Sequence, residues 1–266
     1  MQLSIITINL NDSEGLKKTI ESVINQTFKN FEFIIIDGGS EDNSINVIQA
    51  FRQNVNYWIS EIDNGIFHAM NKGILKATGE FLLFLNSGDI LVDNKILEKV
   101  IPNIETDNDI VYCNCYINMG NKLSNHILPE EISIPFLITS SLAHQATFIN
   151  KKVFYEIGLY SENNQFCSDW EFFLKAYLAK KYKFKHVLLF TTIFNTYGKT
   201  WNAENDKMLC EERNRINKNY FNPELIDLTY NYLDLKKKYD LIVNSKFYKF
   251  FKLIYNNKFY RFIKYH

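Results

Sequence analysis

The sequence lacks several features that would place the chain in a familiar class. Its charge is balanced, with 30 Lys and Arg against 30 Asp and Glu, so overall charge indicates neither a nucleic acid nor an acidic substrate. The four cysteines form no C-x-x-C pair, which favours reduced, structural thiols and a reducing cytoplasm. The apolar run in residues 1–9 is too short for a signal peptide or a membrane span. We therefore expect a soluble cytoplasmic protein.

Two common nucleotide-binding motifs are absent as well. No G-x-G-x-x-G follows the first expected strand, and no G-x-x-x-x-G-K-[ST] occurs in the chain. Dinucleotide-binding and P-loop functions therefore lose their main support. We find no internal repeat, and 266 residues suffice for one large domain or one domain with an appendage.

The first hundred residues alternate between apolar runs and amphipathic segments. The expected strands are Leu3–Ile8, Phe31–Ile36, Tyr57–Ile59 and Phe81–Leu85, and the expected helices between them are 14–25, 43–51 and 66–76. Strands that are apolar on both faces and separated by helices indicate a parallel sheet with helices on both sides. The fold class is therefore α/β.

The second part of the chain has a mixed pattern. Its expected elements are a helix at 94–100, a strand at 109–116, a hairpin turn at 118–121, a loop over the site at 129–141, helices at 151–157 and 169–181, and a strand at 184–194.

From about residue 204 the sequence predicts helix, and residues 236–266 are strongly basic and aromatic. They hold nine Lys or Arg and ten Tyr or Phe against the single acid Asp240. This pattern suits an amphipathic helix on an anionic membrane, which would place the protein on the inner face of the plasma membrane. The alternative is a helical appendage packed on the domain or on a second subunit of a homodimer. No known nucleic-acid-binding motif accompanies the basic residues, so we expect no nucleic acid partner.

Polar residues follow each of the first four expected strands. Thr7 and Asn9 end the first strand, and Asp37, Asp63 and Asp89 follow the next three. Because ligands of open α/β sheets bind at the carboxyl ends of the strands, these corners predict a nucleotide site. The glycines after Asp37 allow the chain to turn beside a ligand.

Five segments in order resemble glycosyltransferase family 2. They are residues 4–9, 33–44, 61–73, 77–80 and 85–89. The resemblance extends over roughly residues 1–200 and implies a GT-A fold, with a mostly parallel Rossmann-like sheet. It divides the chain into a domain at 1–203, with a nucleotide-sugar half at 1–90 and an acceptor half at 91–203, and a helical extension at 204–266.

The resemblance also implies roles for individual residues. Thr7, Asn9 and Asp37 would hold the nucleoside. Asp63, Asn71 and Lys72 would lie beside the nucleotide and sugar. Asp89 would coordinate Mg²⁺ or Mn²⁺, and a cation that bridges the phosphates stabilises the charge of the departing diphosphate.

The chain departs from the family pattern at this acidic corner. Many members have further aspartates where this sequence has Asn86 and Gly88. We expect Asn86 to contribute to donor binding, and Asp89 to hold the metal with fewer protein ligands than is usual. His68 stands where relatives often have an acid.

The second half resembles the acceptor side of the family. Asp169 matches the catalytic aspartate, which would take the proton from the acceptor hydroxyl, although Ser168 replaces the usual preceding acid. His144 would contact the acceptor or the diphosphate, or order the loop, and Lys199 would contact a phosphate. We expect Trp170 to form a wall of the site. As a plain structural alternative, Asp169 only caps its helix.

These residues predict an inverting glycosyltransferase. It would move a sugar from a nucleotide-sugar donor, expected to be a UDP-sugar, to a saccharide or lipid-linked saccharide acceptor in cell-surface polysaccharide synthesis. The alternative is a degenerate, non-catalytic binding or scaffold module at the membrane. A nucleotidyltransferase is a weaker alternative, because the Gly-rich, basic segment that it uses after strand one is absent.

Overall fold

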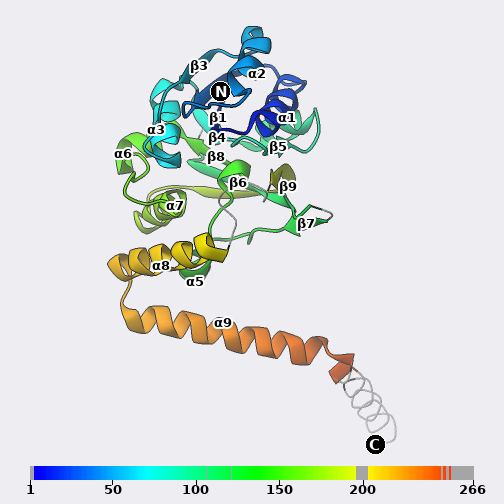
Figure 1. Ribbon diagram of the computed structural model, residues 1–266. Helices are drawn as coiled ribbons and strands as arrows, with labels where there is room; N and C mark the ends of the chain where they lie inside the picture. The colour runs from blue at the N-terminus through cyan, green and yellow to red at the C-terminus, as the bar shows by residue number, and fades with distance from the viewer. Residues whose placement is uncertain are drawn as a thin grey trace, which may run out of the picture. The chain divides into compact units, whose positions relative to one another are not determined.

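The computed structural model of the chain describes residues 3–105, 107–120, 122–195, 203–246, 248–249 and 252 (Figure 1). The chain divides into two units, Met1–Ile216 and Asn217–His266. The first unit therefore extends beyond residue 203, where the sequence led us to place the domain boundary.

The strands of the first unit form one mixed sheet. Their bounds are β1 Leu3–Asn9, β2 Phe31–Asp37, β3 Tyr57–Ser60, β4 Phe81–Phe84, β5 Ile90–Leu91, β6 Ile110–Asn118, β7 Leu123–His126, β8 Thr147–Asn150 and β9 Phe184–Asn195. The strand order is β3-β2-β1-β4-β8-β6-β9-β5, and β7 pairs with β6. Strands β1 to β4 pair in parallel, as do β6 and β9, whereas β8 is antiparallel to its neighbours β4 and β6.

The helices lie on both faces of this sheet, as Figure 1 shows for α1 and α3 on either side of β1 and β4. Their bounds are α1 Ser13–Ile24, α2 Ser44–Ala50, α3 Ile66–Lys76, α4 Ile96–Val100, α5 Ile134–Thr139, α6 Lys151–Ile157, α7 Ser168–Leu178, α8 Ala203–Tyr220 and α9 Pro223–Asn244. Short 3₁₀ helices occupy Arg52–Asn54 (η1), Ile101–Asn103 (η2) and His144–Ala146 (η3). The mostly parallel α/β architecture expected from the sequence is confirmed.

Side chains of β1 alternate between the two faces of the sheet, and helices cover both faces. Ile5 is fully buried in one core cluster with Leu16 and Ile20 of α1. Ile6 points to the other face, because successive side chains of a strand alternate. There α3 packs closely, since a Cβ added at Gly73 would lie 2.4 Å from Ile6 Cγ2.

One of the five family-like segments, residues 77–80, supports the fold at the amino ends of the strands. Glu32 is buried and accepts hydrogen bonds from Ser4 Oγ and from the backbone N–H groups of Thr78 and Gly79. Burial would raise the pKa of Glu32, but these hydrogen bonds lower it below its usual value. A Cβ at Gly79 would lie 2.4 Å from Ser4 Oγ, so only glycine fits this turn. The segment therefore stabilises the fold through hydrogen bonds and lies away from the carboxyl edge of the sheet.

Several local expectations need correction. The region 129–141 is not simply a loop, because α5 begins after Ser133, whose hydroxyl accepts from Phe136 N, and carries a proline in its first turn. Strands β5 and β8 were not foreseen, since two- and four-residue strands contain too few side chains for a readable period. Helix α7 ends at Leu178, three residues before the expected end.

The C-terminal unit contains the end of α8 and all of α9. Helix α9 begins where Asn222 caps it by accepting from Glu224 N, with Pro223 as the first helical residue. Within the part of the chain that the structure describes, no helix combines the length and the apolar character needed to cross a membrane.

Candidate active site

The carboxyl ends of β1 and β2 meet at the expected edge of the sheet. Asn9 and Asp37 are paired in the strand register, and Asn9 Nδ2 donates to Asp37 Oδ1 at 2.7 Å. Both side chains are buried. The fold thus brings together two residues that lie far apart in the sequence.

Asp37 is already saturated with internal donors. Its Oδ1 accepts from Asn9 and from Ser40 Oγ at 2.6 Å, and its Oδ2 accepts from Ser40 N at 2.9 Å and Ser60 Oγ at 2.6 Å. Burial would raise the pKa of Asp37, but the hydrogen bonds from Ser40, Ser60 and Asn9 lower it below its usual value. A nucleobase can gain a hydrogen bond from this carboxylate only by displacing one of these donors.

Two other atoms at this edge have free acceptor capacity. Thr7 Oγ1 and Asn9 Oδ1 are buried and have no hydrogen-bond partner among the described residues. Buried polar atoms without partners are costly, so such atoms in a native fold call for an explanation, and a bound ligand is one.

The residues expected beside the donor form a charged cluster at the start of α3. Lys72 Nζ lies 2.5 Å from Asp63 Oδ1 and 2.7 Å from Glu61 Oε1, and His68 Nδ1 lies 3.3 Å from Asp63 Oδ1. Burial would lower the pKa of Lys72, but its hydrogen bonds to Asp63 and Glu61 raise it. Lys72 remains a cation whose charge the two carboxylates balance.

Asn71 connects the two halves of the domain through hydrogen bonds. Its Nδ2 donates to the Tyr160 carbonyl at 2.9 Å and to Glu162 Oε1 at 3.0 Å, while its Oδ1 accepts from Tyr160 N at 3.0 Å. The buried amide is thus committed to orienting the turn before α7.

The turn after β4 is held in place by α1. Thr19 Oγ1 donates to the Asp89 carbonyl at 2.8 Å and accepts from Gly88 N at 3.0 Å. Gly88 has φ +93°, a conformation that side-chain-bearing residues rarely adopt. The local backbone therefore accounts for glycine at this position.

His144 joins the turn after β4 to the expected base. Its Nδ1 lies 2.8 Å from Asp169 Oδ2, and its Nε2 lies 3.3 Å from Asn86 Nδ2. Asp169 lies in the first turn of α7, where its Oδ1 accepts from the N–H of Trp170 at 2.8 Å.

The charge of Asp89 also acts on the imidazole, and Asp89 lies in the same turn as Asn86, which His144 contacts. Burial would lower the pKa of His144, but the hydrogen bond and charge of Asp169 and the charge of Asp89 raise it overall. The sequence did not foretell this arrangement, because Asn86 and Asp169 belong to different halves of the domain.

Asp89 has the properties that a divalent cation needs. Its side chain is buried, Oδ1 accepts from Asn195 N at 3.1 Å, and Oδ2 has no hydrogen-bond partner among the described residues. Burial raises the pKa of Asp89 to about 7, although the charge of His144 and two backbone N–H groups oppose this shift. A cation beside Oδ2 would stabilise the ionised carboxylate.

The described residues place no cluster of three or more His, Cys, Asp or Glu side chains where they could hold a metal together. The residues therefore fit a cation that takes one oxygen from Asp89 and its remaining ligands from phosphate and water, as Mg²⁺ commonly does.

Two further predictions have different outcomes. Lys199 lies outside the described residues. Trp170 does not form a wall of the site, because it is buried, donates from Nε1 to the Leu137 carbonyl at 2.6 Å and has the Arg213 guanidinium 5.1 Å from its ring. Packing by α5 and α8, which sequence alone could not supply, accounts for the difference.

Two residues near Asp169 escaped the sequence analysis. Tyr160 is buried, its hydroxyl has no hydrogen-bond partner among the described residues, and it interacts electrostatically with Asp169. Glu212 of α8 accepts from the backbone N–H groups of residues 165, 166 and 167 at 2.8, 3.0 and 2.7 Å. Nothing in the sequence marked Glu212, because its partners are backbone groups distant along the chain.

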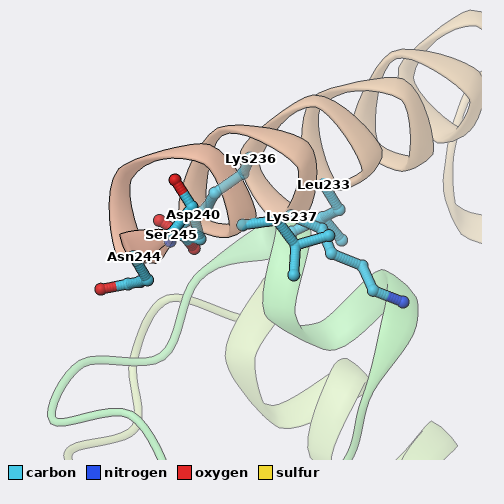
Figure 2. A pocket seen from close by; sticks show the side chains of 7 residues that line it. Leu233, Lys236, Lys237, Asp240, Asn244 and Ser245 are labelled. Atoms are coloured by element: carbon cyan, nitrogen blue, oxygen red, sulfur yellow. The ribbon is translucent and has the colours of Figure 1, made fainter. Parts of the chain in front are cut away.

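A pocket of about 310 Å³ opens beside this region. It is lined by residues 64–67 at the start of α3 and by residues 162–165 before α7, so both halves of the domain contribute. Figure 2 shows a different pocket, whose lining residues all belong to α9 and its C-cap and include none of the predicted site residues.

The sheet and the helices on its two faces define a GT-A-type fold. The sequence profile described as "Glycosyl transferase family 2" matches residues 4–182. The chain belongs to glycosyltransferase family 2 and is a glycosyltransferase, as the five segments predicted.

Relatives support this assignment. A "PGL/p-HBAD biosynthesis glycosyltransferase" of Mycobacterium tuberculosis is 27% identical over 209 residues, which cover 77% of this chain and 80% of that protein. An uncharacterised glycosyltransferase of the same species is 31% identical over 186 residues, which cover 66% of this chain and 69% of the relative.

Solved structures share the fold. Staphylococcus aureus TarS has a TM-score of 0.62 at 18% identity, and the match covers 84% of this chain and 44% of TarS. TarS 1–349 in complex with UDP-GlcNAc has a TM-score of 0.61 at 18% identity, with 82% of this chain and 73% of that one covered. The mannosyltransferase PcManGT of Pyrobaculum calidifontis, solved with GDP-Man and Mn²⁺, has a TM-score of 0.59 at 10% identity and covers 94% of this chain and 82% of its own.

Proposed function

We propose that this glycosyltransferase inverts the anomeric configuration as it transfers a sugar from a UDP-sugar to a saccharide or lipid-linked saccharide of the cell surface. The observation that carries the proposal is that His144 contacts both Asp169 and Asn86, and Asn86 lies in the same turn as Asp89, whose N–H donates to the Asn86 carbonyl. This arrangement supports a role for Asp89 at a metal-bound diphosphate and a role for Asp169 at the acceptor hydroxyl. The nucleotide-sugar complexes of TarS and PcManGT agree with this class of donor.

On the donor side, Thr7 and Asn9 offer unpaired acceptor atoms to a nucleoside at the end of β1. Lys72 supplies a cation near the start of α3. Asp89 would hold Mg²⁺ or Mn²⁺, which when bound stabilises the negative charge of the leaving diphosphate.

On the acceptor side, Asp169 accepts the proton of the attacking hydroxyl. The acceptor oxygen forms a bond to the anomeric carbon while the bond from that carbon to the diphosphate breaks, and attack from the opposite face inverts the configuration. His144 and the Trp170 N–H fix the orientation of the Asp169 carboxylate. The proton ends on Asp169 and the electron pair of the broken bond on the diphosphate.

The decisive experiment is a donor screen with UDP-, GDP- and dTDP-sugars, with and without Mg²⁺ or Mn²⁺. For the preferred donor, Asp169→Asn should lower kcat by about 10²–10⁴-fold and leave UDP binding nearly unchanged, because only the proton acceptor is lost. An unchanged kcat in Asp169→Asn would remove the base from the mechanism.

A second candidate is a non-catalytic glycosyltransferase-like binding module at the membrane. One observation favours it, which is that both Asp169 oxygens already accept hydrogen bonds inside the protein. UDP binding without turnover of any donor in the same screen, together with tight association with a partner enzyme, would support this candidate.

A further inference from the structure

Six large apolar side chains form one exposed stripe along α9. Their exposed fractions lie between 40 and 65%, and their spacing in the sequence is 3-4-3-4-3. We call this stripe the seam; it consists of Leu225, Leu228, Tyr232, Leu235, Tyr239 and Ile242. Spacings that alternate between three and four residues are those of the a and d positions of three heptads, which is the pattern of helices that pair along their length.

The charges of α9 favour a protein partner over an anionic membrane. Within Pro223–Asn244 there are four acidic side chains and three lysines, so the helix has no excess of positive charge. Lys238 is moreover paired with Asp234 of the same helix at 2.6 Å. A membrane-bound amphipathic helix would instead carry a basic polar face.

The seam is complementary to itself when one copy is reversed. The spacing reads the same in both directions, so an antiparallel second copy places each a position opposite a d position. The resulting layers are Leu225–Ile242, Leu228–Tyr239 and Tyr232–Leu235, each occurring twice. Every tyrosine then faces a leucine and the layers have similar volumes, whereas a parallel pair would stack tyrosine on tyrosine and leucine on leucine.

The flanking residues also suit the antiparallel pair. Lys238 lies beside the seam, and reversal brings it opposite Asn231 of the other copy. Lys236 falls opposite Thr229, which is buried within its own chain. No lysine faces a lysine across the seam. The pocket of Figure 2 lies off the seam, because none of its lining residues, including Leu241, is a seam residue.

We propose that α9 pairs antiparallel with α9 of a second copy of this chain, across a two-fold axis that passes between Leu233 and Asp234. The interface is isologous, since the same six side chains serve both copies. The seam spans about 26 Å of helix at 1.5 Å per residue. The apolar pattern stops near the end of α9, because the next a and d positions are occupied by Lys246 and Lys249.

Leu235 and Leu241 provide a matched pair of variants for the full-length protein. Both are leucines of α9, 65 and 66% exposed, but only Leu235 belongs to the seam. We expect the wild type to have twice the monomer mass of 31.4 kDa in light scattering. Leu235→Glu should weaken the dimer by at least about 100-fold, because it buries an unpaired charge in two layers, and Leu241→Glu should not.

The proposal is overturned if the wild type is monomeric, if Leu235→Glu remains dimeric, or if both variants weaken the dimer equally. Circular dichroism of both variants confirms that α9 stays helical. A monomeric wild type whose sedimentation with phosphatidylserine vesicles is lost in Leu235→Glu but kept in Leu241→Glu would show that the seam binds membrane instead.

Cysteine cross-linking tests the direction of pairing. Leu228 faces Tyr239 of the other copy only in the antiparallel arrangement. The double variant Leu228→Cys with Tyr239→Cys should give a disulfide-linked dimer on mild oxidation, and Leu228→Cys alone should not. Cross-linking of the single variant would establish parallel helices and contradict the proposal.

Discussion

At the scale of single residues, His144 determines what the site can do. Its Nδ1 holds Asp169, its Nε2 lies beside the Asn86 amide, and its charge acts on Asp89. A neutral imidazole accepts from the amide at Nε2. A protonated imidazole instead requires the oxygen of Asn86, which has no hydrogen-bond partner among the described residues. The protonation state of the His144 imidazole thus affects both Asn86 on the donor side and Asp169 on the acceptor side.

The raised pKa of Asp89 predicts a pH-dependent stability of the metal-free protein. The folded carboxyl has a pKa of about 7 and the ordinary value is 3.8, so between these pH values the folded state keeps a proton that the unfolded state has lost. The contribution of this group to stability is therefore full below pH 3.8 and is lost as pH rises to about 7. The loss is on the order of 4 kcal/mol.

Denaturant unfolding in EDTA at pH 4 to 8 measures this effect. Asp89→Asn does not titrate, so its free energy of unfolding should rise relative to that of the wild type across this range. Mg²⁺ with UDP at pH 7.5 should stabilise the wild type and not the variant. If the free energies of unfolding of the two proteins change with pH in the same way, burial does not raise the pKa of Asp89.

At the scale of elements, α8 contributes to the site although the sequence placed it in an extension. Its residues up to Ile216 belong to the first unit. Arg213 donates to the Thr139 carbonyl of α5 at 3.0 Å, and Glu212 binds the three N–H groups before α7. Helix α8 thereby fixes the segment from which Asp169 projects.

Replacement of Glu212 by Ala should destabilise the protein and slow the reaction. Three backbone donors lose their acceptor, which costs about 2 kcal/mol if water replaces it only in part. Displacement of the loop before Asp169 should also lower kcat. The neighbouring Glu211 is 67% exposed and pairs only loosely with Lys207 at 3.9 Å, so Glu211→Ala is the control. Equal unfolding midpoints and kcat values for the two variants would argue against this role.

At the scale of the whole molecule, the C-terminal region consists of two segments that differ in charge. Helix α9 carries the exposed seam and balanced charge. Residues 245–266 contain six Lys or Arg and no Asp or Glu, and most of them lie outside the described residues. We therefore restrict the predicted membrane contact, which stays a prediction, to the segment after α9.

Deletion of residues 246–266 should abolish sedimentation with anionic vesicles and leave UDP binding unchanged. Each basic side chain near an anionic surface contributes about 1 kcal/mol, so the binding should also weaken with salt. Neutral phosphatidylcholine vesicles are the control. Unaltered sedimentation of the shortened protein would contradict a membrane role for this segment.

Patterns local in the sequence determined the architecture and the family. The apolar runs ending in Asn9, Asp37 and the turn before Asp89 were readable because a buried strand and its polar end occupy consecutive residues. The expected helices and most strands followed from periodicity for the same reason. The mostly parallel sheet and the glycosyltransferase assignment are accordingly confirmed, whereas the roles of the individual site residues stay predictions.

Only the tertiary structure decided how the site residues are used. Asp37 accepts from Ser40 and Ser60, Asn71 brackets Tyr160, and Glu212 holds the loop before α7. Most of these partners lie far apart along the chain, and a hydrogen bond between them depends on how helices pack on the sheet. A sequence records which polar groups are present, but packing determines which of them remain free for a ligand.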